Sequence, residues 1–202
     1  MGNQSEIKKN FGKRAAKYRK SATHGNPDDL LRMIKLLKPQ PDAIALDVAT
    51  GGGHTAVALA KHVQKVIAID ITPEMQAEAA IQAGNEGAAN IEFQICDVHN
   101  LPFASGRFDL VTSRFAPHHF YNIKTALQEM CRVLKPGGLL YILDCSVFDG
   151  EETDWFERME VEQSTRQEIF RILSRLSAEA KALYPYGENY ITTYRFELLA
   201  IV

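Results

Sequence analysis

Two short apolar runs with a glycine turn between them constrain this chain more than any other feature. Residues 44–48 have the pattern of a buried β-strand, glycines follow at once, and residues 66–69 have the pattern of a second strand that ends in Asp70. A strand, a glycine turn, a helix and a second strand in this order build half of a nucleoside-binding crevice. The sequence therefore predicts an α/β fold with a ligand site at the carboxyl ends of these strands.

The negative charge at the end of the first strand restricts which class of ligand can bind there. Asp47 stands directly before the glycines, where the pyrophosphate of a dinucleotide would have to lie, and a carboxylate would repel it. The same carboxylate favours a ligand that carries an ammonium or sulfonium group. S-adenosylmethionine (SAM) is the simplest such nucleoside. A structural role, in which Asp47 accepts hydrogen bonds from the amides of the turn, stays open.

The apolar patterns along the rest of the chain alternate between strands and helices. The sequence predicts further strands at residues 91–95, 108–112 and 139–143, with helices at about 54–62, from 73 onward and at 126–134. Such alternation is typical of a Rossmann-like, doubly wound, mostly parallel sheet with helices on both faces. Two helices precede it, at about 5–21 and after the cap Asn26-Pro27. Two amphipathic helices and a final strand at 190–202 are expected after Asp144.

Composition excludes several classes of protein. The 202 residues have a formal net charge of −2, so no nucleic-acid partner is expected, and no apolar run is long enough for a membrane span. Cys96, Cys131 and Cys145 are scattered and form no CxxC pair, which indicates a reducing, cytoplasmic environment without a zinc site. Buried cysteines of this kind are more typical of small apolar side chains than of a site for a thiophilic substrate.

The glycine turn and the acid after it form a weak motif when taken alone. Gly51 and Gly53 let the backbone approach a ligand, but Gly51-x-Gly53-x-x-Ala56 also fits the dinucleotide fingerprint of a nicotinamide oxidoreductase. Asp70 is placed to accept both ribose hydroxyls. It could instead cap the next helix, although Thr72 suits that role better.

Taken together, five segments resemble one family. Class I SAM-dependent methyltransferases have a similar ordered series, and the small-molecule group of ubiquinone/menaquinone and biotin-pathway methyltransferases is most similar. The resemblance covers about Phe11 to Leu143, and the segments that carry it are 46–53, 69–70, 96–98, 108–113 and 132–138. It implies methyl transfer from SAM to a small-molecule acceptor by in-line displacement, with S-adenosylhomocysteine as the product.

The resemblance also implies which positions hold the cofactor. The methionine end and the methyl group would lie against Asp47, Ala49, Thr50, Gly51, Gly53, Ser113, Arg114 and Phe115. The ribose would bind Asp70, and the adenine would lie against Ile71, Met75, Asp97 and Val98. The family usually has glycine at the position of Ala49, and an alanine fits there if its φ is negative. In similar enzymes the 132–138 segment ends in a structural turn, not a phosphate loop.

Fewer residues can be assigned to contact with the methyl acceptor. Tyr18 and His24 lie in a segment that forms a helical lid over the cofactor in similar enzymes, so each is a candidate for cofactor or acceptor contact. His118 and His119 follow the fourth strand at the mouth of the crevice. Either could act as a general base with a pKa near neutrality, or simply pack. Tyr18 is a third catalytic candidate. Adjacent histidines are poor joint metal ligands, so no metal is expected.

We expect a single domain of residues 1–202, with a helical lid at 1–40, a cofactor-binding core at 41–148 and a shortened C-terminal part at 149–202. Residues 145–154 are too few for the helix and sixth strand that relatives usually place there. The edge of the sheet would then be open, which favours a homodimer. The shortening also motivates an alternative, a SAM-binding sensor or partner subunit without methyltransferase activity.

Overall fold

In the computed structural model, residues 9–145, 181–183 and 195–201 are described, with side-chain environments for residues up to 144. The helices are α2 (Ala15–Arg19), α3 (Pro27–Leu37), α4 (His54–Ala60), α5 (Pro73–Asn85), the short 3₁₀ helix η1 (Pro117–His119) and α6 (Ile123–Val133). The strands are β1 (Ile44–Val48), β2 (Lys65–Asp70), β3 (Ile91–Ile95), β4 (Phe108–Arg114), β5 (Leu134–Cys145), β6 (Lys181–Leu183) and β7 (Arg195–Ile201).

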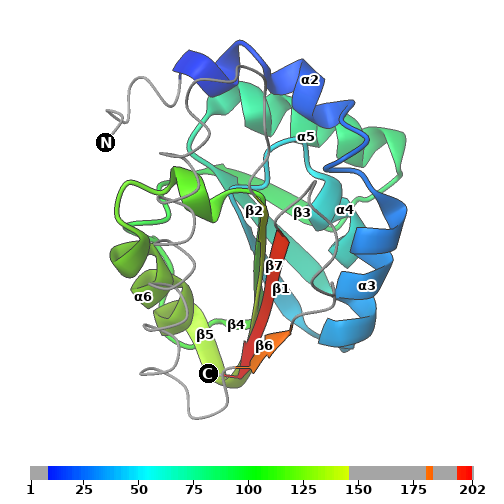
Figure 1. Ribbon diagram of the computed structural model, residues 1–202. Coiled ribbons are helices and arrows are strands. Elements are labelled where there is room, and N and C mark those ends of the chain that lie inside the picture. Colours follow the sequence, from blue (N-terminus) through cyan, green and yellow to red (C-terminus); the bar gives the residue numbers. More distant parts are fainter. Residues whose placement is uncertain (1–8, 146–180, 184–194, 202) are drawn as a thin grey trace, which may run out of the picture.

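One twisted sheet organises the fold, with strand order β3-β2-β1-β4-β5-β7-β6 (Figure 1). The first five strands pair in parallel, whereas β7 runs antiparallel to β5 and β6 antiparallel to β7. The order reverses between β1 and β4, which places a topological switch point at the end of β1. The predicted doubly wound α/β architecture is confirmed.

Helices cover both faces of the sheet (Figure 1): α3 and α4 lie on one side and α6 on the other. Because successive strand residues point to opposite faces, each strand contributes to both layers. Leu46 packs into the layer that contains Leu127 of α6, and Ala45 into the layer that contains Met33 of α3. All four side chains are fully buried. This is why the strands appear in the sequence as continuous apolar runs.

The start of α3 follows from its capping residues, as predicted. The side-chain oxygen of Asn26 accepts hydrogen bonds from the amides of Asp28 (2.9 Å) and Asp29 (3.3 Å), and Pro27 opens the helix. The helix stops at Lys38, whose φ of 45° is left-handed. The chain is thereby aimed into β1, whose predicted bounds of 44–48 are confirmed.

The turn before the fifth strand interrupts the pairing of β4 with β5. Phe108 pairs with Leu134, but the next pair is Leu110 with Leu139, so residues 135–138 form an irregularity within β5. The ammonium group of Lys135 is 2.7 Å from Oδ1 of Asp109. The segment therefore has a structural role at the opposite end of the strands from the ligand site.

The predicted C-terminal architecture needs a correction. A sixth strand was expected to be missing and the sheet edge open, but β6 is present at residues 181–183, and β7 pairs with β5 from Leu139 to Cys145. The sixth strand comes late in the chain, so the short stretch of residues 145–154 did not reveal it. The predicted final strand is confirmed for residues 195–201. The two helices predicted after Asp144 lie outside the described residues.

Candidate functional site

A pocket opens at the carboxyl ends of β1, β2 and β4, beneath the N-terminal segment. It brings together most of the residues that the sequence singled out. Predicted site residues that line it are Tyr18, His24, Asp47, Ala49, Thr50, Gly51, Asp70, Ile71, Met75, Asp97, Val98, Arg114, Phe115 and His119. Gly53, Ser113 and His118 do not line it. Gly52, within the predicted turn, lines it as well, and so do His54, Thr55, His99 and Tyr121, which no motif in the sequence marked.

Asp47 is the most constrained charged group in the pocket. Its side chain is 1 % exposed, and Oδ1 accepts a hydrogen bond from the Thr112 hydroxyl at 2.8 Å. Oδ2 has no hydrogen-bond partner among the described residues. Burial raises the pKa of Asp47 to about 6, although neighbouring hydroxyls and Arg114 oppose the shift. No amide of the turn satisfies Oδ2, so the hydrogen bond to Oδ1 leaves the second oxygen available to a ligand. A cationic group in the pocket would satisfy this oxygen.

Asp70 connects the pocket to the backbone that surrounds it. Its Oδ2 accepts a hydrogen bond from the amide of Gly51 (3.0 Å) and its Oδ1 from the amide of Thr72 (2.9 Å). Thr72 occupies the cap position of α5, but its side chain makes no capping hydrogen bond, contrary to expectation. Burial raises the pKa of Asp70 as well. The carboxylate therefore serves the helix start and the pocket wall together.

The three glycines of the turn have three different neighbours. A Cβ on Gly51 would find only the carbonyl oxygen of Ala49, 4.0 Å away, so this glycine faces open space. A Cβ on Gly52 would lie 2.7 Å from the backbone of Arg19, and one on Gly53 would lie 3.0 Å from Ala79 of α5. The predicted close approach to a ligand fits Gly51. The space beside Gly53 is instead taken by Ala79 of α5.

Ala49 departs from the conformation expected of it. Its φ is +55°, in the left-handed region, and not negative as expected for an alanine. An alanine there costs about 1 kcal/mol relative to glycine. The conformation is held by the turn, because the next amide, that of Thr50, donates a 2.9 Å hydrogen bond to the carbonyl of Ile69 in β2.

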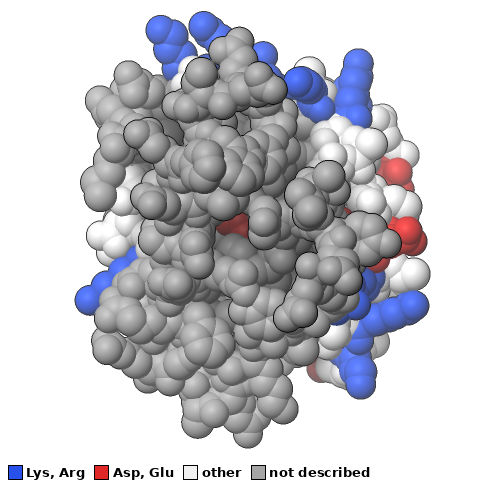
Figure 2. All heavy atoms as spheres, in the orientation of Figure 1, with Lys and Arg blue, Asp and Glu red and all other residues white. Residues whose placement is uncertain are grey.

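The N-terminal segment packs over the glycine turn. Arg19 forms a 2.5 Å ion pair with Glu78 of α5, and the carbonyl of Tyr18 lies 3.3 Å from Nε2 of His54. Arg114 donates to the carbonyl of His24 at 3.3 Å and to the Thr55 hydroxyl at 3.2 Å. In Figure 2, Lys and Arg side chains gather along the edge that carries α2. Polar contacts thus join the N-terminal segment to α4, α5 and the end of β4.

Aromatic rings join this segment to the end of β4 and to η1. Phe11 contacts Tyr18 and His119, with ring centroids 5.7 and 4.8 Å apart. His24 contacts Tyr18 at 4.9 Å and Phe115 at 5.1 Å. All five rings line the pocket together with Asp47 and Arg114, and they give this part of the pocket a largely aromatic wall.

The two adjacent histidines have different environments. His118 is held by Asp144, whose Oδ1 is 2.7 Å from Nδ1 and whose Oδ2 accepts from the backbone amide at 2.9 Å. Asp144 is 2 % exposed, at the end of β5. His119 lines the pocket instead, and loss of bulk water together with His118 and His24 lowers its pKa. For His119 the predicted near-neutral pKa is therefore wrong, and its imidazole is neutral at pH 7.

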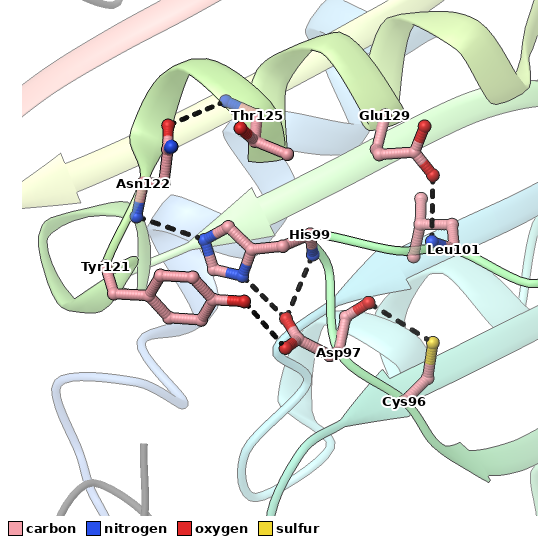
Figure 3. A network of polar contacts seen from close by, with 8 residues as sticks. All are labelled: Cys96, Asp97, His99, Leu101, Tyr121, Asn122, Thr125 and Glu129. Carbon is pink, nitrogen blue, oxygen red and sulfur yellow. Dashed lines mark hydrogen bonds and ion pairs between the residues drawn. The ribbon is translucent and has the colours of Figure 1, made fainter. Parts of the chain in front are cut away.

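A hydrogen-bonded cluster that includes Asp97, His99 and Tyr121 also lines the pocket (Figure 3). Oδ1 of Asp97 accepts from the amide (2.9 Å) and Nδ1 (2.6 Å) of His99, and Oδ2 accepts from the Tyr121 hydroxyl (3.0 Å). Burial raises the pKa of Asp97, but these hydrogen bonds outweigh burial, so the pKa lies below its usual value. The carboxylate is therefore ionised at neutral pH.

Neither described cysteine side chain has the environment of a reactive thiol. Burial raises the pKa of Cys96 and of Cys131 to about 11. Among the described residues no group of His, Cys, Asp and Glu could hold a metal ion. No helix in the described part of the chain is long and apolar enough to cross a membrane.

Comparison with known proteins shows which proteins the chain is similar to. Residues 46–142 match the family model described as a methyltransferase domain. An uncharacterized methyltransferase of Bacillus subtilis, YcgJ, is 37 % identical over 134 residues, which are 66 % of this chain and 53 % of that protein. A ubiquinone/menaquinone biosynthesis C-methyltransferase of Hydrogenovibrio crunogenus is 37 % identical over 56 % of this chain and 46 % of its own length. The chain thus spans about half the length of these relatives.

Solved structures of methyltransferases have a similar fold. The structure of a SAM-dependent methyltransferase from Aquifex aeolicus superposes with a TM-score of 0.60 at 20 % identity and covers 100 % of both chains. At this identity the likeness concerns the fold.

Proposed function

We propose that this chain is a class I SAM-dependent methyltransferase and that it transfers a methyl group from SAM to a small-molecule acceptor, with S-adenosylhomocysteine as the product. The observation that carries the proposal is the buried carboxylate of Asp47, with one oxygen that has no hydrogen-bond partner among the described residues. It faces a pocket at the topological switch point, where ligands of such sheets bind. The α-ammonium group of SAM fits this acceptor.

We assign the predicted cofactor residues along the pocket. Asp47 and the turn of residues 49–52 would hold the methionine end, with Arg114 and Phe115 beside it. Asp70 would accept the ribose hydroxyls, and Ile71, Met75, Asp97 and Val98 would surround the adenine. Gly53 and Ser113 would act through the backbone geometry that they give to the turn and to β4, since they do not line the pocket.

The proposed reaction needs little acid–base catalysis by the protein. The sulfonium of bound SAM supplies an activated methyl group. The chain's own residues orient the cofactor and exclude water beneath Tyr18 and His24, and they leave a flat-sided space for the acceptor. His119 is neutral and can hydrogen-bond an acceptor hydroxyl. His118, whose Nδ1 lies 2.7 Å from Oδ1 of Asp144, does not line the pocket, so of the two adjacent histidines it is His119 that is placed to contact an acceptor.

The proposal includes a division of the chain into a lid at 1–40, a core at 41–148 and a C-terminal part at 149–202, as well as a cytoplasmic location. A homodimer was expected from an open edge at the fifth strand. Because β7 covers that edge, the main reason for it is gone, although a dimer through another surface stays a prediction.

The first test is calorimetric titration with SAM and S-adenosylhomocysteine, with NAD as the control for an oxidoreductase. Binding of both adenosyl ligands but not of NAD supports the proposal. Failure of both to bind contradicts it. Acceptors are then screened by production of S-adenosylhomocysteine, beginning with demethylated quinones because one relative is named for ubiquinone and menaquinone biosynthesis. Tight cofactor binding without turnover on any acceptor favours the second candidate, a SAM-binding sensor or partner subunit.

A further inference from the structure

The cluster around Asp97 links two segments that are distant in the sequence. Asp97 and His99 follow β3, whereas Tyr121 and Asn122 precede α6 (Figure 3). The rings of His99 and Tyr121 stack with their centroids 3.6 Å apart and an interplanar angle of 23°. Asp97, His99 and Tyr121 all line the pocket. The wall of the pocket is thus built by contacts across these two segments.

The tautomer of His99 is fixed from both sides. The amide of Asn122 donates to Nε2 of His99 at 3.2 Å, and an amide can only donate. Nδ1 therefore carries the proton and donates it to Oδ1 of Asp97. Asn122 is itself anchored, because its side chain accepts the amide of Thr125 at 3.0 Å and so begins α6. Asn122 at the start of α6 is thus connected through His99 to the carboxylate of Asp97.

We infer that Tyr121 and His99 are positioning residues that orient the Asp97 carboxylate toward the base of the cofactor and so make the pocket select a purine with a donating 6-amino group. The inference rests on the proposed function. An ionised carboxylate only accepts hydrogen bonds. A 6-amino group meets it as a donor, whereas the carbonyl oxygen of a 6-oxo purine would face it with a second acceptor and be repelled.

Tyr121 offers the cleaner test of the two residues. It is 42 % exposed, and its hydroxyl makes the hydrogen bond to Asp97 while its ring makes the stacking contact. Tyr121→Phe removes the first contact and keeps the second. Removal of a hydrogen bond to a charged group should loosen the carboxylate without opening the fold.

The experiment measures the Kd of S-adenosylhomocysteine and of S-inosylhomocysteine, its 6-oxo analogue, by calorimetry. For Tyr121→Phe we expect S-adenosylhomocysteine to bind about fivefold to tenfold more weakly, the size expected from one such hydrogen bond. The Kd of S-inosylhomocysteine should change less than about twofold, which is the deviation expected between groups that do not interact. Ser105→Ala, which removes an exposed hydroxyl outside the pocket, is the matched control and should leave both values unchanged.

A double-mutant cycle separates positioning from a general loss of structure. If Tyr121 acts through Asp97, then Tyr121→Phe has no further effect on the Kd ratio in an Asp97→Asn background. The inference is overturned if Tyr121→Phe leaves the ratio of the two Kd values unchanged. It is also overturned if Tyr121→Phe weakens the binding of S-adenosylhomocysteine equally in the wild-type and the Asp97→Asn backgrounds. Either result leaves the proposed function intact. A wild-type protein that binds neither SAM nor S-adenosylhomocysteine overturns both.

Discussion

The amide of Gly51 donates a hydrogen bond to Oδ2 of Asp70 at 3.0 Å, so a single carboxylate both holds the glycine turn and lines the pocket. The other oxygen of Asp70 accepts the amide of Thr72 at the start of α5. The acid that the sequence placed at the end of the second strand therefore has two structural contacts in addition to its proposed ligand.

Asp70→Ala should lower both ligand affinity and stability. We expect S-adenosylhomocysteine to bind at least tenfold more weakly, because two hydrogen bonds to the ribose are lost. The free energy of unfolding should fall by about 2 kcal/mol, because the amides of Gly51 and Thr72 lose their acceptor. Calorimetry and urea denaturation measure these effects. The control is Asp42→Ala, at an exposed position outside the pocket, and a comparable loss of affinity there would contradict a specific role for Asp70.

The pKa of Asp47 predicts a pH-dependent cofactor affinity. Burial raises this pKa from 3.8 to about 6, so the carboxyl is protonated in the free protein below pH 6 and must ionise to hold an ammonium group. The affinity for S-adenosylhomocysteine should therefore fall by up to about tenfold per pH unit as the pH drops below 6. Calorimetry between pH 5 and pH 8 measures it. An Asp47→Asn protein should bind weakly and show a flatter profile, and an equally steep profile would assign the dependence to another group.

The same shift affects the stability of the free protein. A folded-state pKa above the unfolded value means that the folded state binds more protons between about pH 4 and pH 6. The stabilisation associated with this proton is complete below the unfolded pKa and is lost as the pH rises through the folded pKa. Asp47→Asn should remove this part of the dependence in urea denaturation across that range.

Gly52→Ala should displace the N-terminal segment. The added Cβ would meet the backbone of Arg19 and of Tyr18 at 2.7 and 2.9 Å, and backbone atoms cannot move aside without the segment. Trypsin should cut faster at the lysines and arginines of residues 9–20, and S-adenosylhomocysteine should bind more weakly. The matched control is Gly84→Ala in α5, where a Cβ meets nothing within 4 Å. That variant should gain about 0.5–1 kcal/mol of stability and keep its protease pattern. Unchanged proteolysis in Gly52→Ala would contradict the packing.

The cysteines of the described core should react slowly. Burial raises the pKa of Cys96 and Cys131 to about 11, so at pH 8 each has roughly a hundredfold less thiolate than an ordinary thiol. In a Cys145→Ser background, labelling with a thiol reagent should be correspondingly slow and rise about tenfold per pH unit. The urea-unfolded protein is the control and should react at the ordinary rate. Rapid labelling of the folded protein at pH 7 would restore the possibility of a thiol-based site.

The sequence by itself determined the five parallel strands and the identity of the acids at the ends of three of them. β1 and β3 have the bounds predicted from short apolar runs, because a buried strand is a local pattern that ends where polar or glycine residues begin. Asp47, Asp70 and Asp97 meet in one pocket because the carboxyl ends of parallel strands lie at one edge of a sheet.

Only the tertiary structure decided which groups surround those acids. His99 and Tyr121 meet through packing of α6, Gly52 faces the backbone of Arg19, and Ala49 is held at a positive φ by a hydrogen bond from the next residue to β2. β6 likewise acquires its place by pairing with β7. Each of these contacts joins residues from separate elements, and a local pattern carries no information on the distance between elements until the whole sheet and its helices have docked.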